Sequence, residues 1–163
     1  MFPQINSREE AAKAVSACTY PPGGIRGVGP RRASLYYTEL YDYLKAADTE
    51  ILKIVQIETM EAVKRIDEIL SVPGIDVAFV GPADLSASMG YITSFPKIEK
   101  EVVDAIVTVQ EACEKHNTIS GIWGGSVENV NKYIERGFKF IALGEDADYM
   151  IRVKDDLAKI ERA

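Results

Sequence analysis

The chain has 163 residues, of which 47% are hydrophobic and 27% charged, a composition typical of one globular domain with its own core. The net charge is −6, with acidic and basic residues interleaved, which argues against a nucleic-acid partner. The apolar runs are too short to span a membrane and the first ten residues lack the features of a secretory signal, so a cytoplasmic protein is expected. Cys18 and Cys113 are interpreted as reduced core thiols.

The predicted elements alternate between helix and strand. Apolar residues at helical spacing predict helices over residues 6–18, 35–47, 59–70, 96–113, 126–137 and 146–160. Short apolar runs predict strands over residues 50–57, 75–80, 118–123 and 138–143, and residues 1–5 resemble the tail of a further strand. Ser7, Thr59 and Ser126 are placed to cap helices, and residues 20–34 form a long loop rich in Gly and Pro.

This alternation predicts an α/β fold in which helices cover a parallel sheet. Two architectures fit: an open doubly wound sheet, or part of a (β/α)8 barrel. Polar residues follow two consecutive strands, at Gln56 to Glu58 and at Gly81 to Asp84, and this placement favours a barrel. A full barrel has about 250 residues. We therefore expect residues 1–163 to form a single partial barrel domain, with an open edge on the strand over residues 50–57.

Two carboxylates are expected to meet at the mouth of this barrel. Side chains alternate along a strand, so Gln56 and Glu58 share a face, which we take to be the barrel interior. Asp84 lies in the loop after the next strand, beside Glu58. Two neighbouring carboxylates repel unless one is protonated or a cation lies between them, and Mg²⁺, Mn²⁺ or Co²⁺ would suit oxygen ligands. The alternative interpretation is a pair of exposed acids that lie near helix starts.

A resemblance to a known family supports the metal interpretation. VQIETMEAVKRIDEILSVPGIDVAFVGPADLSASMG (residues 55–90) closely resembles the metal-dependent pyruvate aldolases of the HpcH/HpaI family, which cleave 4-hydroxy-2-oxo acids. YPPGGIRGVGPRRAS and FPQINSREEAAKAV resemble that family's long loop and its fourth strand with the following helix. The resemblance implies the C-terminal portion of a (β/α)8 barrel that lacks the first three strands, and a homo-oligomer, since the family forms hexamers with an exchanged C-terminal helix.

The resemblance also implies the roles of the site residues. Glu58 and Asp84 would be the two metal ligands, Gln56 would hydrogen-bond the substrate, and the backbone N–H groups of Ala83 and Asp84 would receive the pyruvate carboxylate. Aldol cleavage would then give pyruvate and an aldehyde through a metal-bound pyruvate enolate. A lysine Schiff base is disfavoured, because Lys53 faces outward and Lys139 lies at a strand base.

The family's histidine base and positioning arginine belong to segments outside this chain, so no catalytic acid–base residue is assigned and the chain alone is expected to be inactive. His116, the only histidine, is expected at the wrong end of the barrel. Arg26, Arg31 and Arg32 are interpreted as solvated surface residues, and Trp123 as a packing residue or a pocket wall. Two other functions stay open: a catalytically dead half-barrel that binds a partner, and a lyase of the citrate-lyase-β or malyl-CoA type.

Overall fold

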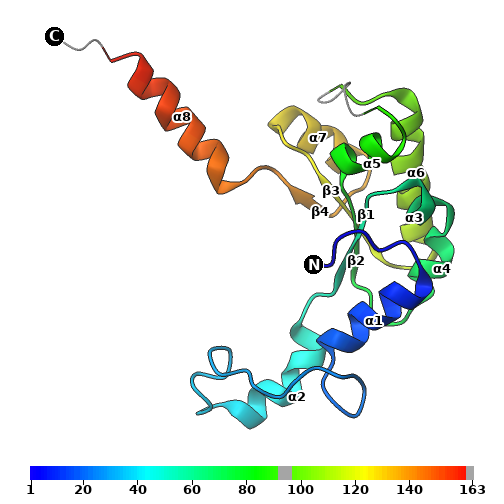
Figure 1. Cartoon of the computed structure of the whole chain (residues 1–163), viewed down its shortest axis with the longest axis vertical. Coiled ribbons are helices and arrows are strands. Elements are labelled where there is room, and N and C mark those ends of the chain that lie inside the picture. The colour runs from blue at the N-terminus through cyan, green and yellow to red at the C-terminus, as the bar shows by residue number, and fades with distance from the viewer. Residues whose placement is uncertain (92–96, 161–163) are drawn as a thin grey trace.

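The computed structural model describes residues 1–91 and 97–160 and is built around a four-stranded parallel sheet (Figure 1). The strands are β1 (Ile54–Ile57), β2 (Val77–Val80), β3 (Ile119–Trp123) and β4 (Phe140–Ala142). Each strand pairs with the next one along the chain, in the order β1-β2-β3-β4. A doubly wound sheet reverses its order at a switch point, whereas a barrel wall runs in sequence, so the observed order matches the barrel alternative.

Eight helices are described. They are α1 (Arg8–Cys18), α2 (Leu40–Glu50), α3 (Met60–Lys64), α4 (Ile66–Leu70), α5 (Pro82–Ser88), α6 (Lys100–Lys115), α7 (Val127–Glu135) and α8 (Asp146–Ala158). The three predicted caps are confirmed, because the side chains of Ser7, Thr59 and Ser126 each accept a backbone N–H from the residue three positions later. These caps fix where the helices behind the sheet begin.

The main hydrophobic core lies between the sheet and the helices. Val55, Ile57, Val80 and Ile122 point into it from the strands and pack among buried residues of α1, α3, α4, α6 and α7. The opposite face of the sheet carries a smaller cluster of Ile54, Val77 and Phe79, with Trp123 and Phe140 packed against it. This alternation confirms the predicted side-chain parity of β1 and identifies the face on which Gln56 lies.

The prediction that β1 has an open edge is wrong. Phe2 forms a parallel bridge with Val55, in which its N–H donates to Ile54 and its carbonyl accepts from Gln56, both at 2.8 Å. The apolar Met1–Ile5 segment thus lies beside β1 in the manner of a fifth strand, as its resemblance to a strand tail predicts. The backbone groups of β1 on that side are therefore partly satisfied.

Several helix and strand boundaries in the structure differ from the predicted ones. The helix expected over residues 35–47 begins only at Leu40, because Leu35, Tyr36 and Tyr37 adopt left-handed φ values of 47°, 57° and 74°. The strand expected from residue 50 begins at Ile54, since α2 continues to Glu50. The helix over 59–70 is interrupted at Arg65, and the expected helix start at Pro96 lies outside the described residues.

The C-terminal helix α8 projects away from the sheet and its covering helices (Figure 1). Met150, Ile151 and Leu157 on this helix are 70%, 57% and 59% exposed, so the helix does not contribute to either hydrophobic cluster. Within residues 1–91 and 97–160, no helix combines the length and apolar character needed to cross a bilayer.

Candidate active site

Glu58 is a buried carboxylate at the carboxyl end of β1. It follows the last strand residue, Ile57, directly, and only 6% of its surface is exposed. Its Oε2 accepts the backbone N–H of Gln4 at 3.0 Å, and its Oε1 accepts the side-chain amide of Gln56 at 2.8 Å. Both donors are neutral, so they orient the carboxylate without cancelling its charge.

Asp84 lies near Glu58, as the sequence predicted. It occupies the first turn of α5, which starts at Pro82 after the end of β2, and β2 is the direct neighbour of β1 in the sheet. Burial raises the pKa of the Glu58 carboxyl above its ordinary value; the Gln4 hydrogen bond partly opposes this, and the charge of Asp84 raises the pKa further. The two carboxylates therefore interact electrostatically.

Gly81 is the close neighbour that sequence reasoning missed. A Cβ at this position would lie 2.9 Å from Oε1 and 3.0 Å from Cγ of Glu58. The backbone between β2 and α5 thus passes directly against the glutamate, and only a glycine leaves the carboxylate its place. The φ and ψ of Gly81, −97° and 95°, suit any residue, so the requirement is for space and not for a special conformation.

Gln56 and Ala83 also lie at this end of the sheet. Gln56 is half-buried on the face of Ile54 and Phe79, and its amide contacts Glu58. Ala83 and Asp84 are exposed in the first turn of α5, where helix geometry leaves backbone N–H groups without intrahelical acceptors. Within the described ranges, no group of three or more His, Cys, Asp or Glu side chains is arranged to hold a metal.

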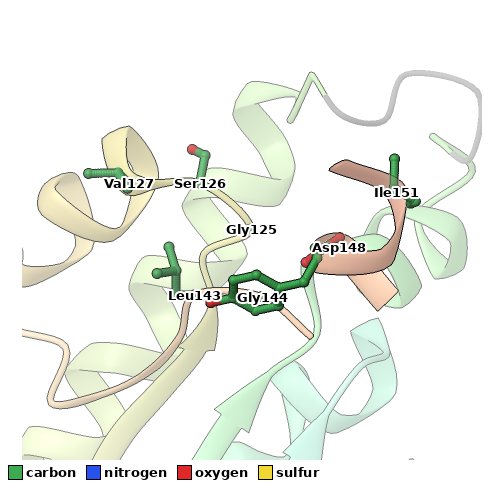
Figure 2. Close-up of a pocket in the computed structure, with 8 residues that line it drawn as sticks. Gly125, Ser126, Val127, Leu143, Gly144, Asp148 and Ile151 are labelled. Carbon is green, nitrogen blue, oxygen red and sulfur yellow. The ribbon is translucent and has the colours of Figure 1, made fainter. Parts of the chain in front are cut away.

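Two open cavities adjoin the same end of the sheet. One, of about 350 Å³, is lined by Pro82, Trp123 and the Gly124–Ser126 turn, among others. The second, of about 300 Å³, lies where β4 leads into α8; Figure 2 shows Leu143, Asp148 and Ile151 around it. Trp123 fulfils both roles considered for it, since it packs on the small hydrophobic cluster and lines a cavity. Neither cavity is lined by Glu58.

His116, Arg26 and Lys53 lie away from Glu58 and Asp84. This position was expected for His116, whereas the contacts of Arg26 differ from those predicted. His116 caps the C-terminus of α6, and its Nε2 lies 2.7 Å from Asp67 Oδ1, at the end of the sheet opposite Glu58. Arg26 is not a freely solvated residue: its guanidinium stacks 4.5 Å from the ring centroid of Tyr20 and donates to the Tyr43 hydroxyl. Lys53 precedes β1 and donates to the carbonyl of Asp48, away from the carboxylates.

The comparison with known proteins identifies the family. A family model described as HpcH/HpaI aldolase/citrate lyase matches residues 1–153. The chain belongs to the HpcH/HpaI aldolase/citrate lyase family. This finding confirms the resemblance carried by the segments VQIET and GPADLS, which contain Glu58 and Asp84.

Similar proteins in this family bear aldolase names. The 4-hydroxy-2-oxo-heptane-1,7-dioate aldolase of Shigella flexneri is 39% identical over 161 residues, which are 97% of this chain and 59% of that protein. The aldolase of the same name from Klebsiella pneumoniae is 37% identical over the same share of both chains. The chain therefore spans about three fifths of the length of these relatives.

Solved structures of two other proteins share the fold. An HpcH/HpaI aldolase/citrate lyase family protein from Burkholderia cenocepacia J2315 superposes with a TM-score of 0.86 at 32% identity, covering 98% of this chain and 63% of that one. The citrate synthase SbnG superposes with a TM-score of 0.79 at 27% identity, covering 96% and 60%. Proteins named for different carbon–carbon bond reactions thus share this arrangement of strands and helices.

Proposed function

We propose that the protein takes part in the divalent-metal-dependent aldol cleavage of 4-hydroxy-2-oxo acids to pyruvate and an aldehyde, and in the reverse condensation. One observation carries the proposal: a buried glutamate and an aspartate come from the ends of adjacent parallel strands in a chain of the HpcH/HpaI family. The aldolase names of relatives at 37–39% identity favour this reaction over a citrate-lyase type.

The chemistry of the site fits a hard divalent cation. Glu58 and Asp84 supply two carboxylates, and the hydrogen bonds to Glu58 come from neutral amides, which leave its charge for a cation to offset. Mg²⁺ and Mn²⁺ take a small number of carboxylates and complete their coordination with water and substrate oxygens. Because Gly81 has no Cβ, no side chain at that position displaces Oε1 of Glu58.

The neighbouring residues suit the binding of a 2-oxo acid. We propose that Gln56 hydrogen-bonds the substrate, as its place beside Glu58 allows, and that the N–H groups of Ala83 and Asp84 receive the substrate carboxylate. When the C3–C4 bond breaks, a base takes the proton of the C4 hydroxyl, the aldehyde leaves, and the electron pair left on C3 takes up a proton to give pyruvate. A bound cation would stabilise the negative charge that develops on the pyruvate portion.

We propose that the sheet is the C-terminal part of a (β/α)8 barrel. The sequential strand order, the helices on one face and the small cluster on the other support this architecture. The family's histidine base and arginine are then supplied from outside residues 1–163, so this chain by itself is expected to cleave substrate slowly or not at all.

We also propose that the protein acts as a homo-oligomer. The helix α8 carries exposed Met150, Ile151, Val153 and Leu157 and projects from the rest of the chain (Figure 1). Apolar side chains on a projecting helix gain stability when another surface covers them. Sedimentation at micromolar concentration should show an assembly larger than a monomer, and a stable monomer would contradict this proposal.

The proposed chemistry can be tested by the binding of pyruvate to the Mn²⁺ form. Bound Mn²⁺ enhances the relaxation of water protons, and pyruvate that displaces water from the ion should reduce this enhancement. Lactate at the same concentration, which lacks the 2-oxo group, serves as the control. An enhancement that pyruvate leaves unchanged, or that lactate reduces equally, would refute the 2-oxo acid site.

A further inference from the structure

The pairing between the N-terminal segment and β1 is irregular at one place. Phe2 pairs regularly with Val55, and a regular parallel ladder would continue with the N–H of residue 4 donating to the carbonyl of Gln56. Instead, the N–H of Ile5 donates to that carbonyl, at 3.2 Å. The N-terminal segment therefore contains one extra residue between its two N–H bonds to β1, and we call this irregularity a bulge because it has the two-against-one count of a β-bulge.

The bulge releases one backbone N–H from the ladder and turns it toward Glu58. Gln4 has a φ of 51°, a left-handed conformation that is unfavourable for a residue with a Cβ. Its N–H donates to Oε2 of Glu58 at 3.0 Å, across 54 positions of sequence. A regular ladder would satisfy the same N–H without the left-handed residue, so backbone satisfaction alone does not explain the bulge.

The core does not require the bulge either. Phe2 and Ile5 both pack into the cluster between sheet and helices. In a regular strand, residues two positions apart share a face, so a segment one residue shorter would place both side chains on that same face. The feature that a regular segment would lose is the hydrogen bond to Glu58. Bulges are frequent next to active sites, where they redirect a group.

We propose that the bulge at Pro3–Gln4 is a positioning device for Glu58 as a metal ligand. The Gln4 N–H holds Oε2 and the Gln56 amide holds Oε1, so the carboxylate is fixed at both oxygens. Each oxygen keeps a further lone pair for a cation shared with Asp84. The inference rests on the proposed function, because it assigns Gln4 a role in the site that Glu58 and Asp84 are proposed to form.

Removal of Gln4 alone tests the proposal. The deletion makes the segment regular, keeps the Phe2 and Ile5 pairings and removes the N–H to Glu58. We expect the dissociation constant for Mn²⁺, measured by calorimetry on the 163-residue chain, to rise at least about tenfold, the lower end of the range for lost outer contacts of metal ligands. Gln4→Gly, which keeps the N–H and fits a φ of 51°, should restore an affinity close to that of the unchanged chain. Deletion of Gly29, in the glycine-rich loop, controls for a shortened chain.

The outcomes separate the two proposals. If the unchanged chain does not bind Mn²⁺, or binds it no more tightly than Glu58→Ala does, both the metal site and the positioning role are overturned. Glu58-dependent binding that survives deletion of Gln4 within about twofold overturns the positioning role only. A second measurement does not depend on the deletion variant folding: the amide proton resonance of Gln4 should shift on titration with Mg²⁺ and should lose that response in Glu58→Ala. A Gln4 amide resonance whose chemical shift does not change on addition of Mg²⁺ would contradict the proposal.

Discussion

Oε1 of Glu58 lies 2.9 Å from the position that a Cβ on residue 81 would occupy. The strand that carries Glu58 and the turn that leads to Asp84 are thus in contact at the carboxylate itself, because residue 81 has no side chain. The relationship joins residues 23 positions apart through the pairing of β1 with β2. It explains why a glycine lies between β2 and α5.

Replacement of Gly81 by alanine should therefore damage the site while the backbone conformation stays allowed. The new methyl group would displace the Glu58 carboxylate, and we expect Mn²⁺ affinity to fall about tenfold or more, as for other lost supports of a metal ligand. Calorimetric titration measures the change. Gly29→Ala is the matched control, since a Cβ at Gly29 meets nothing within 4 Å. Equal affinities for the two variants would show that Glu58 is not confined by the turn.

The pKa of Glu58 gives the metal-free chain a defined pH dependence. Because burial and Asp84 raise this pKa above 4.5, the folded state favours the protonated form. The stabilisation is full below the ordinary pKa and is lost as pH rises through the raised value. In the presence of a chelator, the melting temperature of the unchanged chain should decrease more than that of Glu58→Gln as pH rises from about 5 to neutral. Saturating Mg²⁺ should remove this fall. Parallel pH profiles of the two proteins would contradict it.

A separate ion-pair cluster should produce the opposite pH dependence. Hydrogen bonds from Lys115 and His116 lower the pKa of Asp67 below 3.8 and connect α4 to the end of α6. Stability from Asp67 is therefore present above that ordinary pKa and is lost as pH falls through the lowered value. Asp67→Asn should lower the melting temperature at neutral pH, with a difference that shrinks below pH 3.8 and in high salt. The control is Asp104→Asn, whose partner Lys100 lies on the same helix; an equal loss in both variants would argue against a special role for the connection between helices.

Gly121 offers a test of the small cluster on the second face of the sheet. A Cβ there would lie 2.9 Å from the Phe79 ring and 3.0 Å from the carbonyl oxygen of Phe140. The backbone oxygen cannot rotate away, so Gly121→Ala should lower the free energy of unfolding by about 1–3 kcal/mol, the usual cost of overpacking. Urea unfolding measures it, again against Gly29→Ala. An unchanged unfolding midpoint would mean that this face is loosely packed.

Local patterns predicted the parts of the fold that depend on local chemistry. Ser7, Thr59 and Ser126 are caps whose acceptor oxygen lies three residues from its donor, and alternation along β1 placed Gln56 opposite Val55. The proximity of Glu58 and Asp84 followed from the rule that parallel strands end at one edge. Apolar spacing failed at Leu35 to Tyr37, because the same spacing also occurs in a loop with left-handed residues.

The contacts that sequence reasoning missed are formed between segments far apart in the chain. The Gln4 N–H reaches Glu58 only because a bulge redirects it. No pattern in residues 1–5 indicates that the segment has one residue more than regular pairing with β1 needs. Arg26 is charged and lies in a glycine-rich loop, which suggested a solvated side chain, yet it stacks on Tyr20 and donates to the Tyr43 hydroxyl. Gly81 could have been found from its place between a buried strand and an acidic residue, where a missing side chain signals close approach.

The central claim is that Glu58 and Asp84 hold a divalent cation, and calorimetric titration of Mn²⁺ into the metal-free chain tests it most directly. We predict saturable binding of one ion per chain, lost in both Glu58→Ala and Asp84→Ala but kept in Asp104→Ala, which removes an exposed aspartate of α6. Binding of equal affinity in the unchanged chain and in the Glu58→Ala and Asp84→Ala variants, or no binding in any of them, would contradict it.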